Sequence, residues 1–340
     1  MPASSRTPSE PDGKLQAIEQ DLQSSLGLLD HPSARSMGEM IRYHFGWSDE
    51  PSSGRGKRVR PLLTLLMCEA CGGDWHRALP AASAVELIHN FSLVHDDIED
   101  HSETRRGRAT VWKLAGIPQA INAGDALFVL SHLTLFRLRD LGIAPERILK
   151  VKQTLDNACL NLTVGQHLDL AFEDRGDVSE EEYSYMVEGK TSSLLSAATA
   201  SGALLADAPE DIVCHASNFG KHLGSAFQAL DDILGIWGSP QITGKPASDD
   251  LLHRKKTLPV VIGLKRSKTF CALWRSGEKS PALIRDMISQ LESCGSLEST
   301  QQVAQRHTDS ALASLHSAAP PSPPRGELEA LARRLLSRQA

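Results

Sequence analysis

Apolar residues recur every three or four positions along most of this chain, and this period constrains the fold more than any other feature of the sequence. A spacing of three and four places apolar side chains on one face of an α-helix, whereas a strand alternates every two residues. No sustained alternation of the strand kind occurs. The sequence therefore predicts an all-α bundle with long helices over residues 14–29, 58–71, 78–100, 118–141, 145–172, 179–205 and 211–234.

The composition fits a globular chain with a substantial core, because 41% of the 340 residues are hydrophobic and 23% are charged. Residues 1–13 are polar and predict a flexible arm. Nothing within residues 14–316 resembles a boundary, so we expect one domain there. Residues 317–326 contain four prolines and predict a linker, which leaves residues 327–340 for a short C-terminal helix.

Charge and hydropathy exclude some partners. The formal net charge is −6, and no Lys/Arg stripe is interleaved with aromatic residues, so nucleic acid is not expected as a partner. The first residues have no apolar stretch behind a charged start, as a signal peptide would. No segment approaches the roughly 20 apolar residues of a membrane span. We therefore expect a cytoplasmic protein.

Three aspartates, Asp96, Asp97 and Asp100, end the apolar helical run over 78–100. At 100° per residue, Asp100 lies about 40° round the helix from Asp96 and about 6 Å further along, so both carboxylates face the same side. Magnesium is bound by such carboxylates together with phosphate oxygens and water. His89, seven residues before Asp96, lies on the same face. The alternative is a solvated acidic helix end, but the helix dipole disfavours acids there, which favours a cationic partner.

A second acidic pair, Asp231 and Asp232, ends another apolar helical run, and Gln228 stands one turn earlier. Two separate pairs of this kind are harder to explain as solvated surface than one. If their helices face each other, the carboxylates would enclose several magnesium ions and a diphosphate.

Cationic side chains of the kind that a diphosphate needs accompany these acids. Lys57 and Arg60 lie where the 58–71 helix begins, and there the free backbone N–H groups also attract phosphate. Any one of these cations alone is more often an ordinary surface charge, and their coexistence with the acids is what favours a phosphate site. The remaining candidates follow the two acidic groups: Arg105, Arg106, Lys190 with Thr191, Lys245 and Lys255.

The chain resembles the trans-isoprenyl diphosphate synthases, also called polyprenyl synthetases, from about residue 54 to residue 264. The resemblance implies a helical bundle with a deep central cavity, a homodimer and three magnesium ions. Several long motifs in one order make the likeness specific: GKRVRP (56–61), LIHNFSLVHDDIEDHSETRRGRAT (87–110), AINAGDALF (120–128), GQHLDLAFE (165–173), EGKTSSLLSAA (188–198), FQALDDILG (227–235) and GKPASDDLLHRKKTLPVV (244–261).

The same resemblance implies roles for individual residues. Asp96 and Asp100 would bind two magnesium ions and Asp231 the third. The supporting acids would be Asp97, Asp232 and Asp250. The allylic diphosphate would be held by Arg105, Lys190, Thr191, Gln228 and Lys255, with Lys245 as a further substrate-binding cation. Isopentenyl diphosphate would be held by Lys57, Arg60, His89 and Arg106. The catalytic set would be Asp96, Asp97, Asp100, Arg105, Lys190 and Asp231.

The sequence departs from the family pattern at three positions. Gly235 stands where the second motif usually has its last aspartate, so one supporting acid is missing. Ala109 replaces a usual proline, and Trp112 replaces a common histidine. The resemblance implies a mostly indirect role for that last aspartate, so we expect magnesium binding to survive. Neither Ala109 nor Trp112 removes a charge that the chemistry needs.

The expected reaction is ionisation of an allylic diphosphate, attack by the isopentenyl double bond and loss of a proton. Ser92 is small and leaves room for a growing chain below the acids. Phe91 stands where the family's geranylgeranyl diphosphate synthases resemble one another in having an aromatic residue. We therefore expect geranylgeranyl diphosphate as product, with farnesyl diphosphate next. The alternative for Phe91 is ordinary core packing.

Two other functions compete with this one. A terpene cyclase on the same scaffold would ionise a ready-made allylic diphosphate, and it would not need the isopentenyl pocket of Lys57, Arg60, His89 and Arg106. A non-catalytic subunit that modulates an active partner could lack ligands in both acidic motifs, and only Gly235 points that way.

Overall fold

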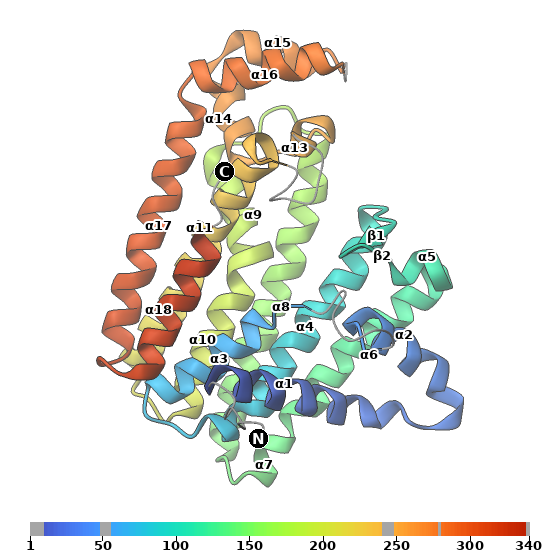
Figure 1. Ribbon diagram of the computed structural model, residues 1–340, viewed down its shortest axis with the longest axis vertical. Helices are drawn as coiled ribbons and strands as arrows, with labels where there is room; N and C mark the ends of the chain where they lie inside the picture. Colours follow the sequence, from blue (N-terminus) through green and yellow to red (C-terminus); the bar gives the residue numbers. More distant parts are fainter. Residues whose placement is uncertain (1–9, 48–55, 240–247, 278–279, 338–340) are drawn as a thin grey trace, which may run out of the picture. The chain divides into compact units, whose positions relative to one another are not determined.

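Helices account for 81% of the chain, and the all-α prediction is confirmed (Figure 1). The computed structural model describes residues 10–47, 56–239, 248–277 and 280–337. Two compact units can be distinguished, and each is described by itself. Unit 1 comprises residues 1–155 and 198–209, and unit 2 comprises residues 156–197 and 210–340. The single domain expected over residues 14–316 stays a prediction.

Unit 1 is built around α4, which packs against α1, α3 and α6. Helix α4 is apolar nearly all round, and a helix of that kind lies inside a protein rather than on its surface. The helices of unit 1 are α1 (Glu10–Leu26), α2 (Arg35–Phe45), α3 (Val59–Ala70), α4 (Leu79–Glu99), α5 (Val111–Ala115), α6 (Ile117–Leu135), α7 (Arg137–Asp140) and the first part of α8 (Pro145–Glu173). The strands β1 (Thr104–Arg105) and β2 (Arg108–Ala109) form one antiparallel hairpin after α4.

Unit 2 is built around α11, which packs against α17 and also contacts α14 and α18. It contains the rest of α8, then α9 (Glu180–Val187), the π-helical turn η4 (Glu188–Ser192), the start of α10 (Ser193–Leu205), α11 (Glu210–Trp237), α13 (Asp249–Leu252), α14 (Leu258–Arg266), α15 (Lys268–Arg275), α16 (Pro281–Ser293), α17 (Ser296–Ala318) and α18 (Pro323–Leu336). The predicted start of a helix at Ser179 is confirmed by a complete capping box with Glu182.

Helix α8 crosses η4 at two glycines, and this contact fixes the place of the π-helical turn. A Cβ atom at Gly165 would lie 2.1 Å from the backbone nitrogen of Lys190. A Cβ atom at Gly189 would lie 2.6 Å from the carbonyl oxygen of Asn161. Both distances are too short for any side chain, so only glycine permits the two backbones to approach this closely. The crossing therefore determines where Lys190 is presented.

The helix boundaries differ from the predictions in several places. The helix expected over 118–141 is divided into α6 and α7, and the helix expected over 179–205 is interrupted by η4. The expected arm over 1–13 is partly helical, because α1 begins at Glu10. The expected linker over 317–326 is also mostly helical. Proline is favoured in the first turn of a helix, and Pro323 begins α18 while the Ser322 hydroxyl accepts a hydrogen bond from a backbone N–H.

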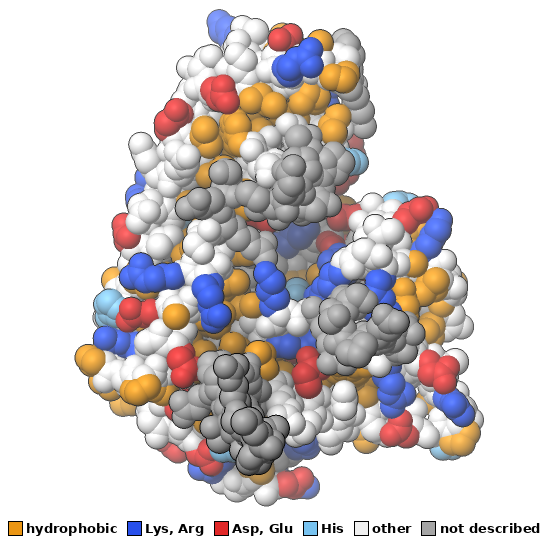
Figure 2. All heavy atoms as spheres, in the orientation of Figure 1, with side chains coloured by type: hydrophobic (Ala, Val, Ile, Leu, Met, Phe, Trp, Pro, Cys, Tyr) orange, Lys and Arg blue, Asp and Glu red, His pale blue; other side chains and the backbone are white. Residues whose placement is uncertain are grey.

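Two of the expectations concern the surface: that no segment spans a membrane and that no nucleic acid binds. Among the described helices, none is both long enough and apolar enough to cross a membrane. On the face drawn in Figure 2, acidic and basic side chains are interspersed. The absence of a nucleic-acid partner stays a prediction.

Candidate active site

The end of α4 divides the first acidic cluster into inward and outward carboxylates. Asp97 is 2% exposed, whereas Asp100 is exposed and Asp96 lies between them in exposure. Asp100 caps the helix, and its backbone N–H donates to the Asp96 carbonyl at 2.8 Å. Because this is the i, i+4 spacing, Asp96 and Asp100 share one face of the helix end. Asp96 and Asp100 thus lie on the same helix face, as the spacing predicts, and their role as metal ligands stays a prediction.

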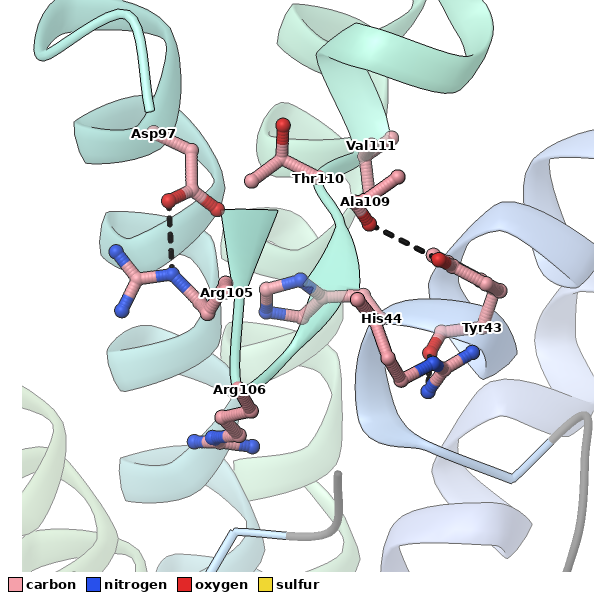
Figure 3. A pocket seen from close by; sticks show the side chains of 9 residues that line it. Tyr43, His44, Asp97, Arg105, Arg106, Ala109, Thr110 and Val111 are labelled. Atoms are coloured by element: carbon pink, nitrogen blue, oxygen red, sulfur yellow. Dashed lines mark hydrogen bonds and ion pairs between the residues drawn. The ribbon is translucent and has the colours of Figure 1, made fainter. Parts of the chain in front are cut away.

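The hairpin after α4 brings an arginine onto these acids (Figure 3). Its turn consists of Arg106 and Gly107, both with positive φ (52° and 74°), as a two-residue hairpin loop requires. Arg105 donates from Nε to Asp97 Oδ1 at 2.8 Å and from Nη2 to Asp96 Oδ2 at 3.1 Å. Burial raises the pKa of Asp97 to about 6, and the Arg105 guanidinium opposes that rise. Asp97 thus holds the arginine in place.

A group of positively charged and imidazole side chains lies beside this hairpin. Arg60 Nη1 donates to His89 Nε2 at 3.2 Å, so the neutral His89 ring carries its proton on Nδ1. Burial, Arg60, Arg106 and Arg105 together lower the pKa of His89 well below its ordinary value. Burial, with the same hairpin arginines, lowers the pKa of His44 to about 3. Arg60 Nε is buried without a hydrogen-bond partner in the described chain. A bound anion would accept a hydrogen bond from this Nε–H.

Helix α2 fixes the hairpin from its other side and contributes residues that the sequence did not indicate. The Tyr43 hydroxyl donates to the Ala109 carbonyl at 2.9 Å. Arg108 donates to the Tyr43 carbonyl at 3.1 Å, and its guanidinium lies 3.9 Å from the centre of the Tyr43 ring. Tyr43 and His44 line one pocket with Asp97 and the hairpin (Figure 3). No spacing rule links α2 to a hairpin more than 50 residues later.

In unit 2, α11 presents the second acidic pair in the same divided way. Asp232 is 3% exposed and accepts hydrogen bonds from the Tyr183 hydroxyl, from Leu258 N at 2.8 Å and from Gln228 Nε2 at 2.9 Å. Burial raises the pKa of Asp232 to about 7, and these hydrogen bonds oppose the rise. Asp231 is exposed, and no described residue pairs with it. One acid is held by the protein and its neighbour is directed outward.

The π-helical turn η4 places polar groups next to this pair. The Thr191 hydroxyl donates to Gln228 Oε1 at 2.8 Å, and Gln228 in turn holds Asp232. Lys190 Nζ donates to Asp169 Oδ2 of α8 at 2.5 Å. π-helical turns occur often at functional sites. Thr191 and Gln228 are thus in direct contact, and Lys190 is the neighbour of Thr191 in the chain. Their role in one substrate site stays a prediction.

The remaining candidate cations are less constrained. Lys57 is exposed directly before α3. Lys255 is exposed after α13, and its backbone N–H donates to the Asp250 carbonyl at 2.9 Å. Lys245 lies outside the described residues. Trp112, at a position where the family often has histidine, donates from Nε1 to the Ser102 carbonyl at 2.9 Å and so anchors the segment that leads into the hairpin.

Comparison with known proteins decides the family. The polyprenyl synthetase family model matches residues 47–291. The chain belongs to the polyprenyl synthetase family. It is 40% identical to a (2E,6E)-farnesyl diphosphate synthase of Mycobacterium tuberculosis, over 89% of this chain and 87% of that protein. It is 36% identical to a geranylgeranyl diphosphate synthase of the same organism, over 95% and 94%. A solved geranylgeranyl pyrophosphate synthetase from Pyrococcus horikoshii has a TM-score of 0.89, with 32% identity and 97% of each chain covered.

The donor set of this polyprenyl synthetase fits magnesium. Asp96, Asp100 and Asp231 offer hard carboxylate oxygens, the ligand type that magnesium prefers. In the described part of the chain, no three His, Cys, Asp or Glu side chains form a preformed ion site. Magnesium does not need one, because it is usually bound through one or two carboxylates, water and substrate phosphates. Asp96 and Asp100 in unit 1 and Asp231 in unit 2 thus have the chemistry of magnesium ligands, and that role stays a prediction.

Phe91 lies among aromatic side chains between α4 and α6. Its ring centre is 5.3 Å from that of Phe128 and 5.5 Å from that of His95. The Ser92 hydroxyl donates to the His89 carbonyl at 2.8 Å, so it is turned back onto its own helix. Phe128 was not among the residues expected to limit chain length, although it lies in a quoted motif. The role of Phe91 in product length stays a prediction, and Phe128 is its packing partner.

Proposed function

We propose that this polyprenyl synthetase condenses isopentenyl diphosphate with an allylic diphosphate, giving a short-chain trans-prenyl diphosphate. The observation that carries the proposal is the division of both acidic pairs. Asp97 and Asp232 are buried and held by protein donors, whereas Asp96, Asp100 and Asp231 are more exposed. Relatives named as farnesyl and geranylgeranyl diphosphate synthases, at 40% and 36% identity, support the same activity.

In the proposed reaction, the allylic C–O bond breaks and its electron pair leaves with pyrophosphate. Bound magnesium supplies positive charge for that leaving group. Arg105 and Lys190 donate N–H groups to it, and Asp97 and Asp169 hold these two cations in place. The double bond of isopentenyl diphosphate supplies the two electrons of the new C–C bond. The proton then lost passes to the pyrophosphate, which acts as the base. The double bond is itself the nucleophile, so the protein needs no nucleophilic side chain.

The isopentenyl diphosphate site is assigned to Lys57, Arg60, His89 and Arg106. Because His89 is neutral and carries its proton on Nδ1, it adds a donor without adding charge. Within the part of the chain that the structure describes, the buried Nε–H of Arg60 has no acceptor, and an anion would supply one. This group also discriminates against the cyclase alternative, because a cyclase has no second diphosphate to bind.

We propose geranylgeranyl diphosphate as the main product, with farnesyl diphosphate next. The proposal depends on Phe91, whose ring packs against that of Phe128 on α6. Relatives with either product name are similar to this chain, so the names support a short product and leave its length to experiment.

We also propose a homodimer, with α6 as the interface. Its outer face carries large apolar side chains that are at least 42% exposed and extend past the helix end: Ile117, Ile121, Val129, Leu133 and Phe136. Asp125 is the one Asp, Glu, Lys or Arg within α6. A surface of this kind is a protein-binding surface. In a twofold dimer the same patch meets itself, and Asp125 is the single carboxylate that each copy of α6 would bring there.

The deciding experiment incubates the purified chain with magnesium, isopentenyl diphosphate and each of three allylic primers, and measures the products. We expect prenyl diphosphates that are longer than the primer. Asp96→Ala should abolish turnover while the far-ultraviolet circular dichroism spectrum and unfolding midpoint stay close to wild type. Full condensation activity in that variant would refute the assignment. Extractable hydrocarbon formed without isopentenyl diphosphate would instead establish a cyclase.

A further inference from the structure

Gly235 stands at the last position of the second acidic motif, and another side chain fills the space beside it. Gly235 follows Asp231 by four residues in α11, so the two positions share one face of the helix. A Cβ atom built at Gly235 would lie 1.8 Å from Asp250 Oδ2 and 2.5 Å from Asp250 Cγ. No side chain fits there while Asp250 keeps its place. The Asp250 carboxylate therefore occupies the volume that a side chain at position 235 would fill.

The fold fixes Asp250 in this place. It lies on α13, a single turn that packs against the end of α11 within unit 2. The Ser248 hydroxyl donates to the Ile236 carbonyl at 3.0 Å, and the fully buried Leu251 packs in one apolar cluster with Ile236. Contacts on both sides of Asp250 thus attach its backbone to the helix turn that contains Gly235. The close approach follows from this attachment.

We propose that Asp250 supplies the acid missing at position 235, so that Asp231 and Asp250 form the outward carboxylate pair of the second cluster. The pair then repeats the arrangement of Asp96 and Asp100, in which two carboxylates lie one turn apart on one helix face. Gly235 is a positioning residue in this arrangement, because its lack of a side chain lets Asp250 reach that face. This inference rests on the proposed function and extends it to a specific magnesium–diphosphate contact.

The competing explanation is that Gly235 serves packing alone, giving room to α13 with no consequence for ligands. The two explanations differ for Gly235→Ala. Alanine forms helix better than glycine by about 1 kcal/mol, and the atom in its way is the tip of a side chain that can rotate. Under our proposal the variant folds at least as well as wild type but binds the ligand less well. Under the packing explanation, any effect appears in stability first.

The test measures binding of inorganic pyrophosphate to the full chain in the presence of magnesium, by calorimetry without turnover. We expect Gly235→Ala and Asp250→Asn to weaken binding about tenfold or more, with unfolding midpoints within a few degrees of wild type. The double variant Gly235→Asp with Asp250→Gly should regain at least half of the lost affinity on a logarithmic scale. Asp249→Asn, next to Asp250 and paired with exposed His253, is the matched control and should bind like wild type.

The possible results separate the inference from the proposed function. Wild-type affinity in Asp250→Asn overturns the inference, and so does a double variant that binds no better than the single ones. A wild-type chain that neither binds magnesium pyrophosphate nor condenses substrates would instead overturn the proposed function. A chain that condenses substrates with Asp250 replaced and affinity unchanged would retain the proposed function and lose only this inference.

Discussion

Arg58 and Arg60 lie two residues apart in one motif, yet the structure gives them different tasks. Arg58 is 3% exposed and donates to Glu19 at 2.6 Å, to Glu86 at 3.0 Å and to the Phe45 carbonyl at 3.5 Å. It therefore connects α1, α2 and α4. Arg60 donates to His89, and its buried Nε has no partner in the described chain. We predict that Arg58→Met destabilises the protein, and that Arg60→Met weakens diphosphate binding.

The size of the first effect follows from what Arg58 leaves behind. Glu86 is 3% exposed, and without Arg58 its carboxylate keeps the Asn90 amide as its one side-chain donor among the described residues. Breaking a buried ion pair on one side costs about 3–5 kcal/mol. A chain of 340 residues has an unfolding entropy of about 0.7 kcal/mol/K, so the midpoint should fall by about 4–7 °C if the whole chain unfolds together. The fall is larger if unit 1 unfolds alone.

The assay is thermal unfolding at pH 7, followed by circular dichroism, for wild type and both variants. Arg60→Met serves as the matched control, because burial lowers the pKa of Arg60 and so already disfavours its charged form. Its midpoint should stay within about 1 °C of wild type or rise, while its affinity for isopentenyl diphosphate falls. An Arg58→Met midpoint within 1 °C of wild type, or a larger loss in Arg60→Met, would show that the contacts of Arg58 have been misjudged.

Three further predictions concern other regions. Burial lowers the pKa of His44 from 6.5 to about 3, so the free energy of unfolding should decrease as the pH falls below about 6.5, by up to about 1.4 kcal/mol per pH unit. In urea unfolding, His44→Gln should show a smaller dependence of this free energy on pH, and an equal dependence would exclude His44 as the cause. Phe91→Ala should lengthen the main product by at least one isoprene unit, measured by chromatography of the dephosphorylated alcohols; unchanged length would reduce Phe91 to core packing. Val129→Lys should shift the proposed dimer to monomer in light scattering, and an unaltered mass would exclude α6 as the interface.

The sequence predicted the seven long helical runs because each carries its own periodic signal, whereas α2 and the helices from α13 to α17 were not predicted. The capping box at Ser179 and the acidic ends of two apolar helices are likewise local patterns, readable without a partner. The hairpin was missed because each of its strands has only two residues, too few for alternation to register. Its stability comes from Tyr43 and from the Arg105–Asp97 pair, which are tertiary contacts.

The same limit applies to the candidate site. Gly235 could be recognised from the sequence as a departure, but the occupation of its space by Asp250 depends on how α13 packs on α11. His44 gave no signal either, since a single histidine on a short amphipathic helix is more often a packing residue. Local sequence patterns thus indicate which residue types are present. That Asp250 of α13 fills the space beside Gly235 of α11 can be seen only in the folded structure.

The adjacent aspartates explain why each cluster contains a pair. Neighbouring residues on a helix point about 100° apart, so one of them faces the core when the other faces outward. An unsupported buried carboxylate is costly, and both clusters avoid that cost with dedicated donors: Arg105 for Asp97, and Tyr183 with Gln228 for Asp232. Those donors are themselves linked to the groups expected to hold substrate. Replacing an inward aspartate should therefore disturb substrate positioning through its donors, whereas replacing an outward one should remove a ligand and leave the donors in place.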